Sequence, residues 1–258
     1  MSFPFKRALV TGASSGIGQA IAARLADEGV DVTAVARRVL QVPAGTKGYA
    51  CDLLDVKAVT ALCGKIRKEE IDLVINVAGS GECVGFEEMD DAAWDRNWQL
   101  MVESPLLIMR AALPGLLASR GALVNVSSLA AEFHLPFMAA YNTAKAALSA
   151  LTISLMDEYP AITIIDLRPG DIRSQFARDW DDDKVAKPWS ATKKHMAKMM
   201  AAAPGPDVVV RRLIAALRRR RSGTLRAGDF FQTILAPLGN RLLPSRLMHA
   251  LRRAYLKR

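Results

Sequence analysis

The sequence of 258 residues predicts an α/β fold in which a doubly wound parallel sheet lies between two layers of helices, α/β/α. Short runs rich in β-branched residues alternate with longer stretches of helical character. The short runs are apolar throughout, which is typical of parallel strands buried on both faces. A glycine-rich turn joins the first run to the first helical stretch, which is the usual start of such a sheet.

Six strands are expected in order, at Lys6–Thr11, Asp31–Ala36, Lys47–Cys51, Ile71–Val77, Ala122–Ser127 and Ile162–Leu167. The helices between them are expected at Gly16–Glu28, Val56–Glu69, about Asp91–Ser119 and Ala139–Glu158. The connection 37–47 is too short for a full crossover helix, so a loop is expected there. Beyond Pro169 and Gly170, Asp207–Arg221 is helical in pattern and Thr224–Ala227 resembles a short last strand.

The chain is expected to form a single domain with a C-terminal helical extension. Residues 1–228 would form the α/β domain, with a lid over its cleft at about 173–204. Residues 229–258 would form the extension. Its residues Leu247 and Leu251 share a helical face, and the rest of the segment is basic.

Composition narrows the class of protein. Three cysteines without paired spacing indicate neither a disulfide framework nor a metal site. No signal-peptide core and no stretch as long as a membrane-spanning helix is evident, so a cytoplasmic protein is expected. The net charge of +9 is concentrated in residues 211–258, which hold thirteen Lys or Arg and one acidic residue, Asp229. The rest of the chain is near neutral, so a nucleic-acid partner is not expected.

The turn after the first strand has the composition of a phosphate-binding loop. Glycines allow the backbone to approach a pyrophosphate, and the helix N-terminus supplies free N–H groups. The loop residues expected to contact a dinucleotide are Gly12, Ser14, Ser15, Gly16, Ile17 and Gly18. The same turn also fits G-x-S-x-G, so a serine hydrolase with Ser14 as nucleophile is an alternative.

The end of the second strand indicates which dinucleotide is bound. NAD-binding sheets usually carry an acidic residue there for the ribose 2′-hydroxyl, whereas this chain has Arg37 and Arg38. Guanidinium groups suit a 2′-phosphate. NADP (NADPH) is therefore preferred over NAD.

Tyr141 and Lys145 are four residues apart in an expected helix and so share a face. A nearby ammonium lowers the pKa of a phenol, which could then exchange a proton with an alcohol or ketone oxygen. Ser128 follows the fifth strand, where its hydroxyl could bond the same oxygen. These three residues are the catalytic candidates.

In order and spacing, the sequence resembles the short-chain dehydrogenase/reductase family through five motifs: TGASSGIG at 11–18, NVAG at 76–79, NVSS at 125–128, YNTAK at 141–145 and RPG at 168–170. The resemblance implies a Rossmann-like fold with Tyr141 as general acid/base. It further implies that Ser128 orients the substrate and that Lys145 binds the nicotinamide ribose. It adds further cofactor contacts at Asp52, Leu53, Asn76, Ala78, Gly79, Pro169, Gly170 and Ile172.

One position departs from the family pattern. Seven residues after Trp94, where the family commonly has an asparagine that helps a proton path behind the lysine, this chain has Met101. For Asp52, a helix N-cap before Val56 is the structural alternative. The change at Met101 bears on efficiency more than on the type of reaction.

The segment between Ser128 and Tyr141 resembles the hydroxysteroid and retinol dehydrogenase branch of the family. An apolar substrate wall is expected from residues on both sides of the site, namely Phe133, His134, Leu135, Phe137, Met138, Phe176, Trp180 and Trp189. His134 would be its polar member. A lipophilic alcohol or ketone fits such a site. Asp181, Asp182 and Asp183 are interpreted as a solvated loop and not as a metal site.

The sequence leaves open what the extension contacts, which oligomer forms and which of two further functions applies. The extension could lie on an anionic membrane surface, making the protein peripheral to a membrane, or pack on a second subunit or on its own domain. The resemblance implies a homodimer or homotetramer through the two long helices. The main functional alternative is a 3-oxoacyl-thioester reductase. A catalytically weak cofactor-binding protein that acts by interaction is the other.

Overall fold

A seven-stranded parallel sheet forms the centre of the molecule. The computed structural model describes residues 2–174, 176, 190–244, 246–248 and 250. The strand order is β3-β2-β1-β4-β5-β6-β7. The strands are β1 (Arg7–Thr11), β2 (Asp31–Ala36), β3 (Lys47–Ala50), β4 (Leu73–Asn76), β5 (Ala122–Val126), β6 (Thr163–Pro169) and β7 (Gly223–Ala227). The predicted α/β class is confirmed, and so are all seven expected strands, with bounds shifted by up to two residues.

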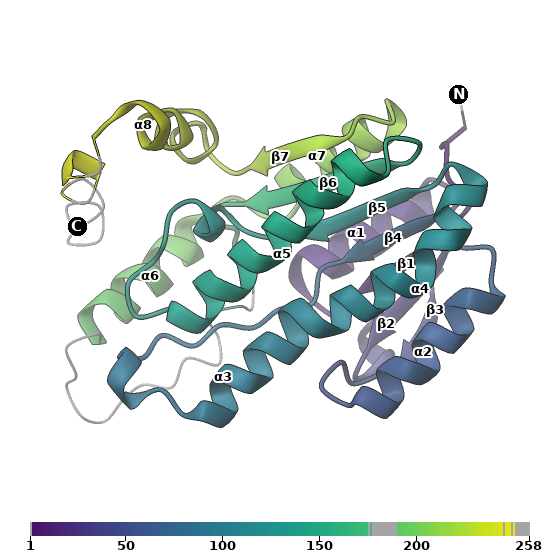
Figure 1. Ribbon diagram of the computed structural model, residues 1–258, viewed down its shortest axis with the longest axis horizontal. Helices are drawn as coiled ribbons and strands as arrows, with labels where there is room; N and C mark the ends of the chain where they lie inside the picture. Colours follow the sequence, from purple (N-terminus) through teal and green to yellow (C-terminus); the bar gives the residue numbers. More distant parts are fainter. Residues whose placement is uncertain (1, 175, 177–189, 245, 249, 251–258) are drawn as a thin grey trace.

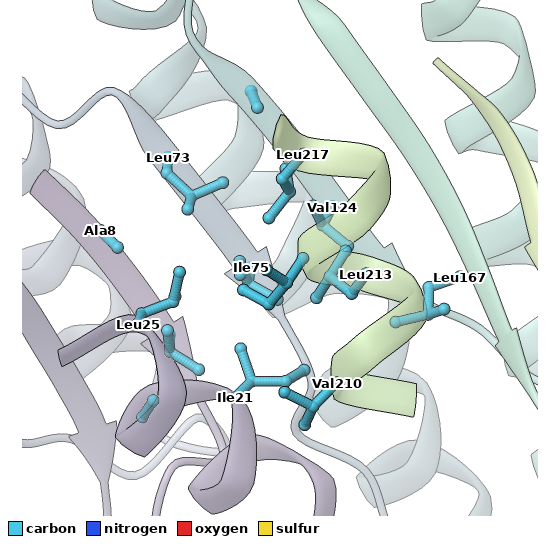
Figure 2. Close-up of a cluster of buried hydrophobic side chains, with 14 of the residues drawn as sticks. Ala8, Ile21, Leu25, Leu73, Ile75, Val124, Leu167, Val210, Leu213 and Leu217 are labelled. Atoms are coloured by element: carbon cyan, nitrogen blue, oxygen red, sulfur yellow. The ribbon is translucent and has the colours of Figure 1, made fainter. Parts of the chain in front are cut away.

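Helices cover both faces of the sheet, as Figure 1 shows. They are α1 (Gly16–Asp27), α2 (Val56–Lys68), α3 (Asp91–Trp98), α4 (Ser104–Ser119), α5 (Ala139–Glu158), α6 (Ser190–Ala202), α7 (Asp207–Arg218) and α8 (Ala236–Leu242). The core between the sheet and helices α1 and α7 is built from side chains such as Ile21, Ile75 and Leu213 (Figure 2). The opposite core packs α2, α4 and α5 on the sheet.

Local sequence fixes the ends of several elements. Asp55 caps α2 by accepting from the backbone N–H groups of Lys57 and Ala58. Arg120 ends α4 in the left-handed conformation, with φ of 50°. Between β2 and β3 the chain makes only a single 3₁₀ turn, Val39–Gln41, which agrees with the expected absence of a crossover helix. The sheet therefore changes winding direction between β1 and β4, and the carboxyl ends of these two strands border a crevice.

The long helix of the sequence prediction is present but is not regular. A π-helical turn, Gln99–Glu103, separates α3 from α4. The expectation that no stretch is long enough to span a membrane is wrong by length and composition. Asp91–Ser119 has 29 residues and a window of mean hydropathy 1.5. Half of that window is buried, because α4 packs on α2, β4 and β5.

The chain beyond β7 extends past the carboxyl ends of the strands. A helical segment runs from Phe230 through the π-helical turn Phe231–Leu235 into α8. Figure 1 shows α8 and α6 at this end of the sheet. The helix α6 lies in a region for which the sequence had indicated no strand.

Candidate active site

A cleft of about 910 Å³ runs along the carboxyl ends of the strands. Its lining reaches from the turn after β1 to the segment after β6 and on to the C-terminal helical segment. The volume lies within the range of ligand-binding clefts. The position is the one at which open α/β sheets bind their ligands.

The turn between β1 and α1 forms one wall of the cleft. Gly12 and Gly16 adopt positive φ, 67° and 54°, which side chains rarely tolerate. A methyl group on Gly12 would lie 2.9 Å from the backbone of Ala78, and one on Gly18 would overlap the carbonyl of Gly12. Ser15 precedes α1 without a side-chain cap, so the helix N-terminus keeps free N–H groups toward the cleft. All six predicted loop residues line the cleft, and the cradle fits a pyrophosphate.

The next wall holds the residues predicted to read the adenosine end. Arg37, Arg38, Asp52 and Leu53 all line the cleft, and both arginines are exposed. Asp52 accepts a hydrogen bond from the backbone of Leu54 at 3.0 Å. The N-cap of α2 is Asp55 instead, so the structural alternative for Asp52 is wrong.

The turn after β4 only partly matches the prediction. Ala78 and Gly79 line the cleft, but Asn76 does not. Asn76 is buried and donates to Asn125 Oδ1 at 2.9 Å, because the two residues are paired in register between β4 and β5. Its Oδ1 has no partner among the described residues. Asn76 therefore lies outside the lining of the cleft, contrary to the expectation, and its side chain links β4 to β5.

The three catalytic candidates meet at one point of the cleft. Ser128 follows β5, while Tyr141 and Lys145 lie on the first two turns of α5. The Ser128 hydroxyl accepts from the backbone N–H of Ala130 at 3.0 Å, and hydrogen bonding from Ser128 lowers the pKa of the Tyr141 phenol. The ammonium of Lys145 donates to the Val126 carbonyl oxygen at 2.8 Å and lies 5.9 Å from the centre of the Tyr141 ring.

Burial controls the proton affinity of this pair. Desolvation raises the pKa of Tyr141 to about 12, although the hydrogen bond from Ser128 opposes the rise. Desolvation also lowers the pKa of Lys145 to about 8, against the attraction of Asp166. The net effect therefore raises the pKa of the phenol, whereas the spacing had led us to expect a lowered value. A phenol in this state is a proton donor at neutral pH.

A layer of buried polar side chains around Asp166 interacts electrostatically with Lys145. Asp166 is completely buried and pairs in register with Asn125, so its side chain faces α5. It accepts from Ser127, from Ser149 at 2.8 Å and from Arg168 Nε at 2.7 Å. Burial raises the pKa of Asp166, and the two serines, Arg226 and Lys145 oppose the rise. The sequence reasoning missed this layer, although polar residues inside apolar strands are its visible signal.

Met101 lies at the centre of the π-helical turn and is fully buried. A methyl group placed on Gly79 would lie 3.4 Å from its Sδ and 3.3 Å from Lys145 Nζ. Met101 therefore lies near Lys145, at the position where the family commonly has an asparagine. Asn97, one turn earlier, is buried, and its Nδ2 donates to the Ala93 carbonyl.

The segment after β6 closes the cleft opposite Lys145. Pro169, Gly170 and Ile172 all line it, as predicted. Gln232 Nε2 donates to Asp171 Oδ2 at 2.6 Å, and its Oε1 accepts from the Asp171 backbone at 3.1 Å. A side chain on Gly170 would overlap Gln232. The C-terminal helical segment is thus seated directly on the edge of the site.

The substrate side is apolar, with one correction. Phe133, His134, Leu135, Met138 and Phe176 line the cleft, and the Phe176 ring lies 5.2 Å from that of Tyr141. Phe137 does not line the cleft. Its φ of 62° is left-handed, which breaks the alternation that would have turned it inward. Trp180, Trp189 and the three aspartates 181–183 lie outside the described residues.

Two groups of lining residues were missed from the sequence. Met196, Met199 and Met200 lie on α6 with helical spacing, which could have identified them as one face. Methionines adapt their shape to apolar ligands. The second group comes from the C-terminal segment, namely Phe231, Gln232, Leu235, Gly239, Leu243 and Met248. No local motif marks that group.

The fold and the glycine cradle together define an α/β protein of the dinucleotide-binding class. The sequence matches the family described as short chain dehydrogenase over residues 6–185. The chain belongs to the short-chain dehydrogenase/reductase family.

Two relatives illustrate the range of the family. A 3beta-hydroxysteroid dehydrogenase of Mediterraneibacter gnavus is 36% identical over 170 residues, which are 61% of this chain and 62% of that protein. The chain thus spans less than two thirds of that relative. The 3-oxoacyl-(acyl-carrier-protein) reductase FabG of Escherichia coli is 31% identical over 198 residues, 72% of this chain and 81% of that protein.

Solved structures show the same fold. A short-chain dehydrogenase from Streptomyces avermitilis superposes with a TM-score of 0.81 at 25% identity, covering 97% of this chain and 99% of that one. One from Burkholderia phymatum in complex with NAD has a TM-score of 0.79 at 22% identity, covering 94% of each chain. One from Sphingobium yanoikuyae in complex with NADPH has a TM-score of 0.72 at 23% identity, covering 97% and 93%.

Proposed function

We propose that the protein is an NADP(H)-dependent oxidoreductase that interconverts a lipophilic ketone and its secondary alcohol. The observation that carries this proposal is the position of Ser128, Tyr141 and Lys145 at one end of a cleft whose other end holds Arg37. Structural neighbours exist with NAD and with NADPH, so they do not decide between the cofactors. The exposed arginines favour the 2′-phosphate.

The residues of the chain support each part of the reaction. A bound nicotinamide would supply or accept the hydride. The hydroxyls of Ser128 and Tyr141 would hold the carbonyl oxygen between them, and Tyr141 would donate its proton to that oxygen. A pKa of about 12 keeps the phenol protonated, which favours the direction of reduction. The hydrogen bond to the Val126 carbonyl oxygen would position Lys145, whose ammonium would bind the nicotinamide ribose.

The apolar lining determines the proposed substrate class. Leu135, Met138, Phe176 and the α6 methionines surround the approach to Tyr141. A sugar would leave its hydroxyls without partners against such a wall, whereas a bulky lipophilic ketone would not. We propose residues 173–204, of which 175 and 177–189 lie outside the described residues, as the lid of this pocket, within a catalytic domain of residues 1–228.

The test follows NADPH and NADH absorbance with a panel of lipophilic ketones, comparing the wild type with Tyr141→Phe. We expect the variant to lose about 10²- to 10⁴-fold in turnover, because only the phenolic proton is removed. Tyr159→Phe is the control, since Tyr159 lies at the far end of α5 and should keep full activity. Activity that survives in Tyr141→Phe would refute the mechanism, and a preference for NADH would refute the cofactor choice.

A 3-oxoacyl-thioester reductase is the second candidate. The Escherichia coli relative supports it, and the basic C-terminal part of the chain would suit an acidic acyl carrier. Including oxoacyl thioesters in the same panel separates the two. A weak cofactor-binding protein is disfavoured because all three catalytic candidates line the cleft. A hydrolase is disfavoured because Ser14 lies in the phosphate cradle and His134 bonds the Ala130 carbonyl instead.

The proposal also includes the cellular location and the oligomeric state of the enzyme. We propose a cytoplasmic homodimer or homotetramer that assembles through α4 and α5, where Leu117 and Ile153 are exposed. Residues 229–258 form its C-terminal extension, and we propose that this extension contacts a membrane surface.

A further inference from the structure

The C-terminal helical segment presents its apolar residues to the outside. Between Phe230 and Leu247 the large apolar side chains are exposed, namely Phe230, Phe231, Ile234, Leu235, Leu238, Leu242, Leu243 and Leu247. Phe231, Ile234, Leu238 and Leu242 follow one another at spacings of three or four residues, so they share one side of the helix. We call the eight residues the outer apolar face.

Contacts with the domain fix this orientation. Thr233 is buried, and Gln232 bonds Asp171 twice, through the oxygen and through the nitrogen of its side-chain amide. Gln232 and Thr233 therefore face the domain, whereas the large apolar side chains between Phe230 and Leu247 remain exposed. This is the reverse of a helix that packs its apolar stripe on its own core. The outer apolar face is too large to be ordinary scatter of surface leucines.

The charge of the segment identifies what covers the face. Residues 230–258 contain six Lys or Arg and no acidic residue. Two copies of such a segment would repel each other, so the charge disfavours a second chain as the occupant. A segment with exposed apolar side chains and a basic sequence is complementary to a bilayer whose headgroups are anionic.

The face is continuous with the substrate cleft. Phe231, Leu235 and Leu243 are exposed and also line the cleft. A surface that covers the outer apolar face would therefore lie at the mouth of the pocket. Gln232 connects the same segment to Asp171 at the edge of the catalytic site.

We propose that the outer apolar face docks on an anionic lipid bilayer, so that the cleft opens toward the membrane and takes up its substrate from the lipid. The choice of substrate source rests on the proposed function, whereas the docking itself does not. Phe230 and Leu242 enter the interface between headgroups and acyl chains, and the exposed Arg246 contacts the headgroups.

The test is co-sedimentation of the full chain with phosphatidylcholine vesicles that contain or lack phosphatidylserine. Leu238→Glu/Leu242→Glu changes two exposed residues that do not line the cleft. Phe86→Glu is the matched control, because Phe86 and Leu242 are each 69% exposed. We expect the wild type and Phe86→Glu to bind anionic vesicles. The double variant should bind at least about tenfold more weakly, because two leucines no longer enter the lipid.

Three results would overturn the docking proposal: wild-type protein that ignores anionic vesicles, a double variant that binds as the wild type does, or equal losses in Phe86→Glu. Light scattering adds a fourth, namely an oligomer that only the double variant dissociates while no vesicle binding occurs.

Turnover is measured in parallel with a water-soluble ketone and with a long-chain ketone dissolved in the vesicles. The double variant should keep the first activity and lose the advantage of vesicles for the second. Failure of vesicle binding with full turnover of the soluble ketone would refute the docking alone. Normal binding without any turnover would refute the proposed function alone.

Discussion

The thioether of Met101 and the ammonium of Lys145 both lie beside Gly79. A methyl group on that glycine would lie 3.4 Å from the sulfur and 3.3 Å from the nitrogen. Sulfur is a weak hydrogen-bond acceptor, so it compensates little of the cost of burying the ammonium. This agrees with a pKa for Lys145 of about 8. Met101 thus helps to keep the surroundings of Lys145 apolar, and these surroundings determine the pH range in which Lys145 is charged.

Replacing this neighbour should move that range. In Met101→Asn an amide oxygen can accept from Lys145, which favours the charged form and raises its pKa. We expect the alkaline fall of activity to shift to higher pH and the free energy of unfolding to fall by about 1–3 kcal/mol, since an amide enters an apolar site. Met101→Leu is the control and should leave the pH profile in place. Identical profiles for the two variants would contradict the argument.

The wild-type enzyme should lose reductase activity as the pH rises through about 8. Below that value Lys145 is charged, and above it the amine is neutral and holds the cofactor ribose less well. Tyr141, with a pKa of about 12, remains protonated over the whole interval. The measurement is kcat against pH between 6 and 10 (roughly the span over which a group with this shift titrates). A rate that stays constant through this interval would show that the charge on Lys145 is not needed for turnover.

Lys145 should also affect stability in a pH-dependent way. Its folded pKa of about 8 lies below the ordinary 10.5, so the unfolded chain binds more protons between these values. The stability of the wild type relative to Lys145→Met should therefore increase as the pH rises from 8 toward 10.5. Denaturant unfolding of both proteins across that range measures it. A constant difference would mean that the lysine is not desolvated.

Arg37 should decide the choice of cofactor. In Arg37→Ser we expect the KM for NADPH to increase at least about tenfold, because a charge-assisted hydrogen bond to the 2′-phosphate is lost. The KM for NADH should hardly change. Arg110→Ser, on the exposed side of α4 and outside the cleft, is the control. Equal effects on both cofactors would remove the argument for NADP.

Asp166 should be among the residues most important for stability. Asp166→Ala leaves the Arg168 guanidinium without its buried partner and two serines without their acceptor, so we expect a loss of about 3–5 kcal/mol. Asp31→Ala breaks an exposed ion pair with Lys47 and should cost at most about 1 kcal/mol. Calorimetry or urea unfolding compares the two. Similar small losses would show that the buried layer is not coupled to folding.

Most of the fold and one part of the site could be predicted from the sequence. Apolar runs such as Ile162–Leu167 fix strands because parallel strands are buried on both faces, and the glycine turn after β1 fixes the cradle. The π-helical turn was not predicted, since one added residue leaves the apolar composition of a long helix unchanged. The place of Asn76 outside the cleft lining was not predictable, because only its register with Asn125 reveals which side it faces.

The substrate end was the least predictable part. Phe137 depends on one left-handed residue, and Phe231 and Leu243 reach the cleft from a segment about 90 residues beyond Tyr141 in the chain. Periodicity shows that such a segment is amphipathic, but it does not show which side packs on the domain.

Because of the π-helical turn at Gln99–Glu103, the rotation of α3 relative to α4 depends on the number of residues between the two helices. Removing one residue there would turn the wide loop of backbone into an ordinary helical turn and rotate α3 by about 100° against α4. Arg96 and Asn97 would then leave the lining of the cleft, while the backbone hydrogen bonds of both helices could still form. A single-codon deletion could therefore rebuild one wall of the pocket without disturbing the sheet beneath it.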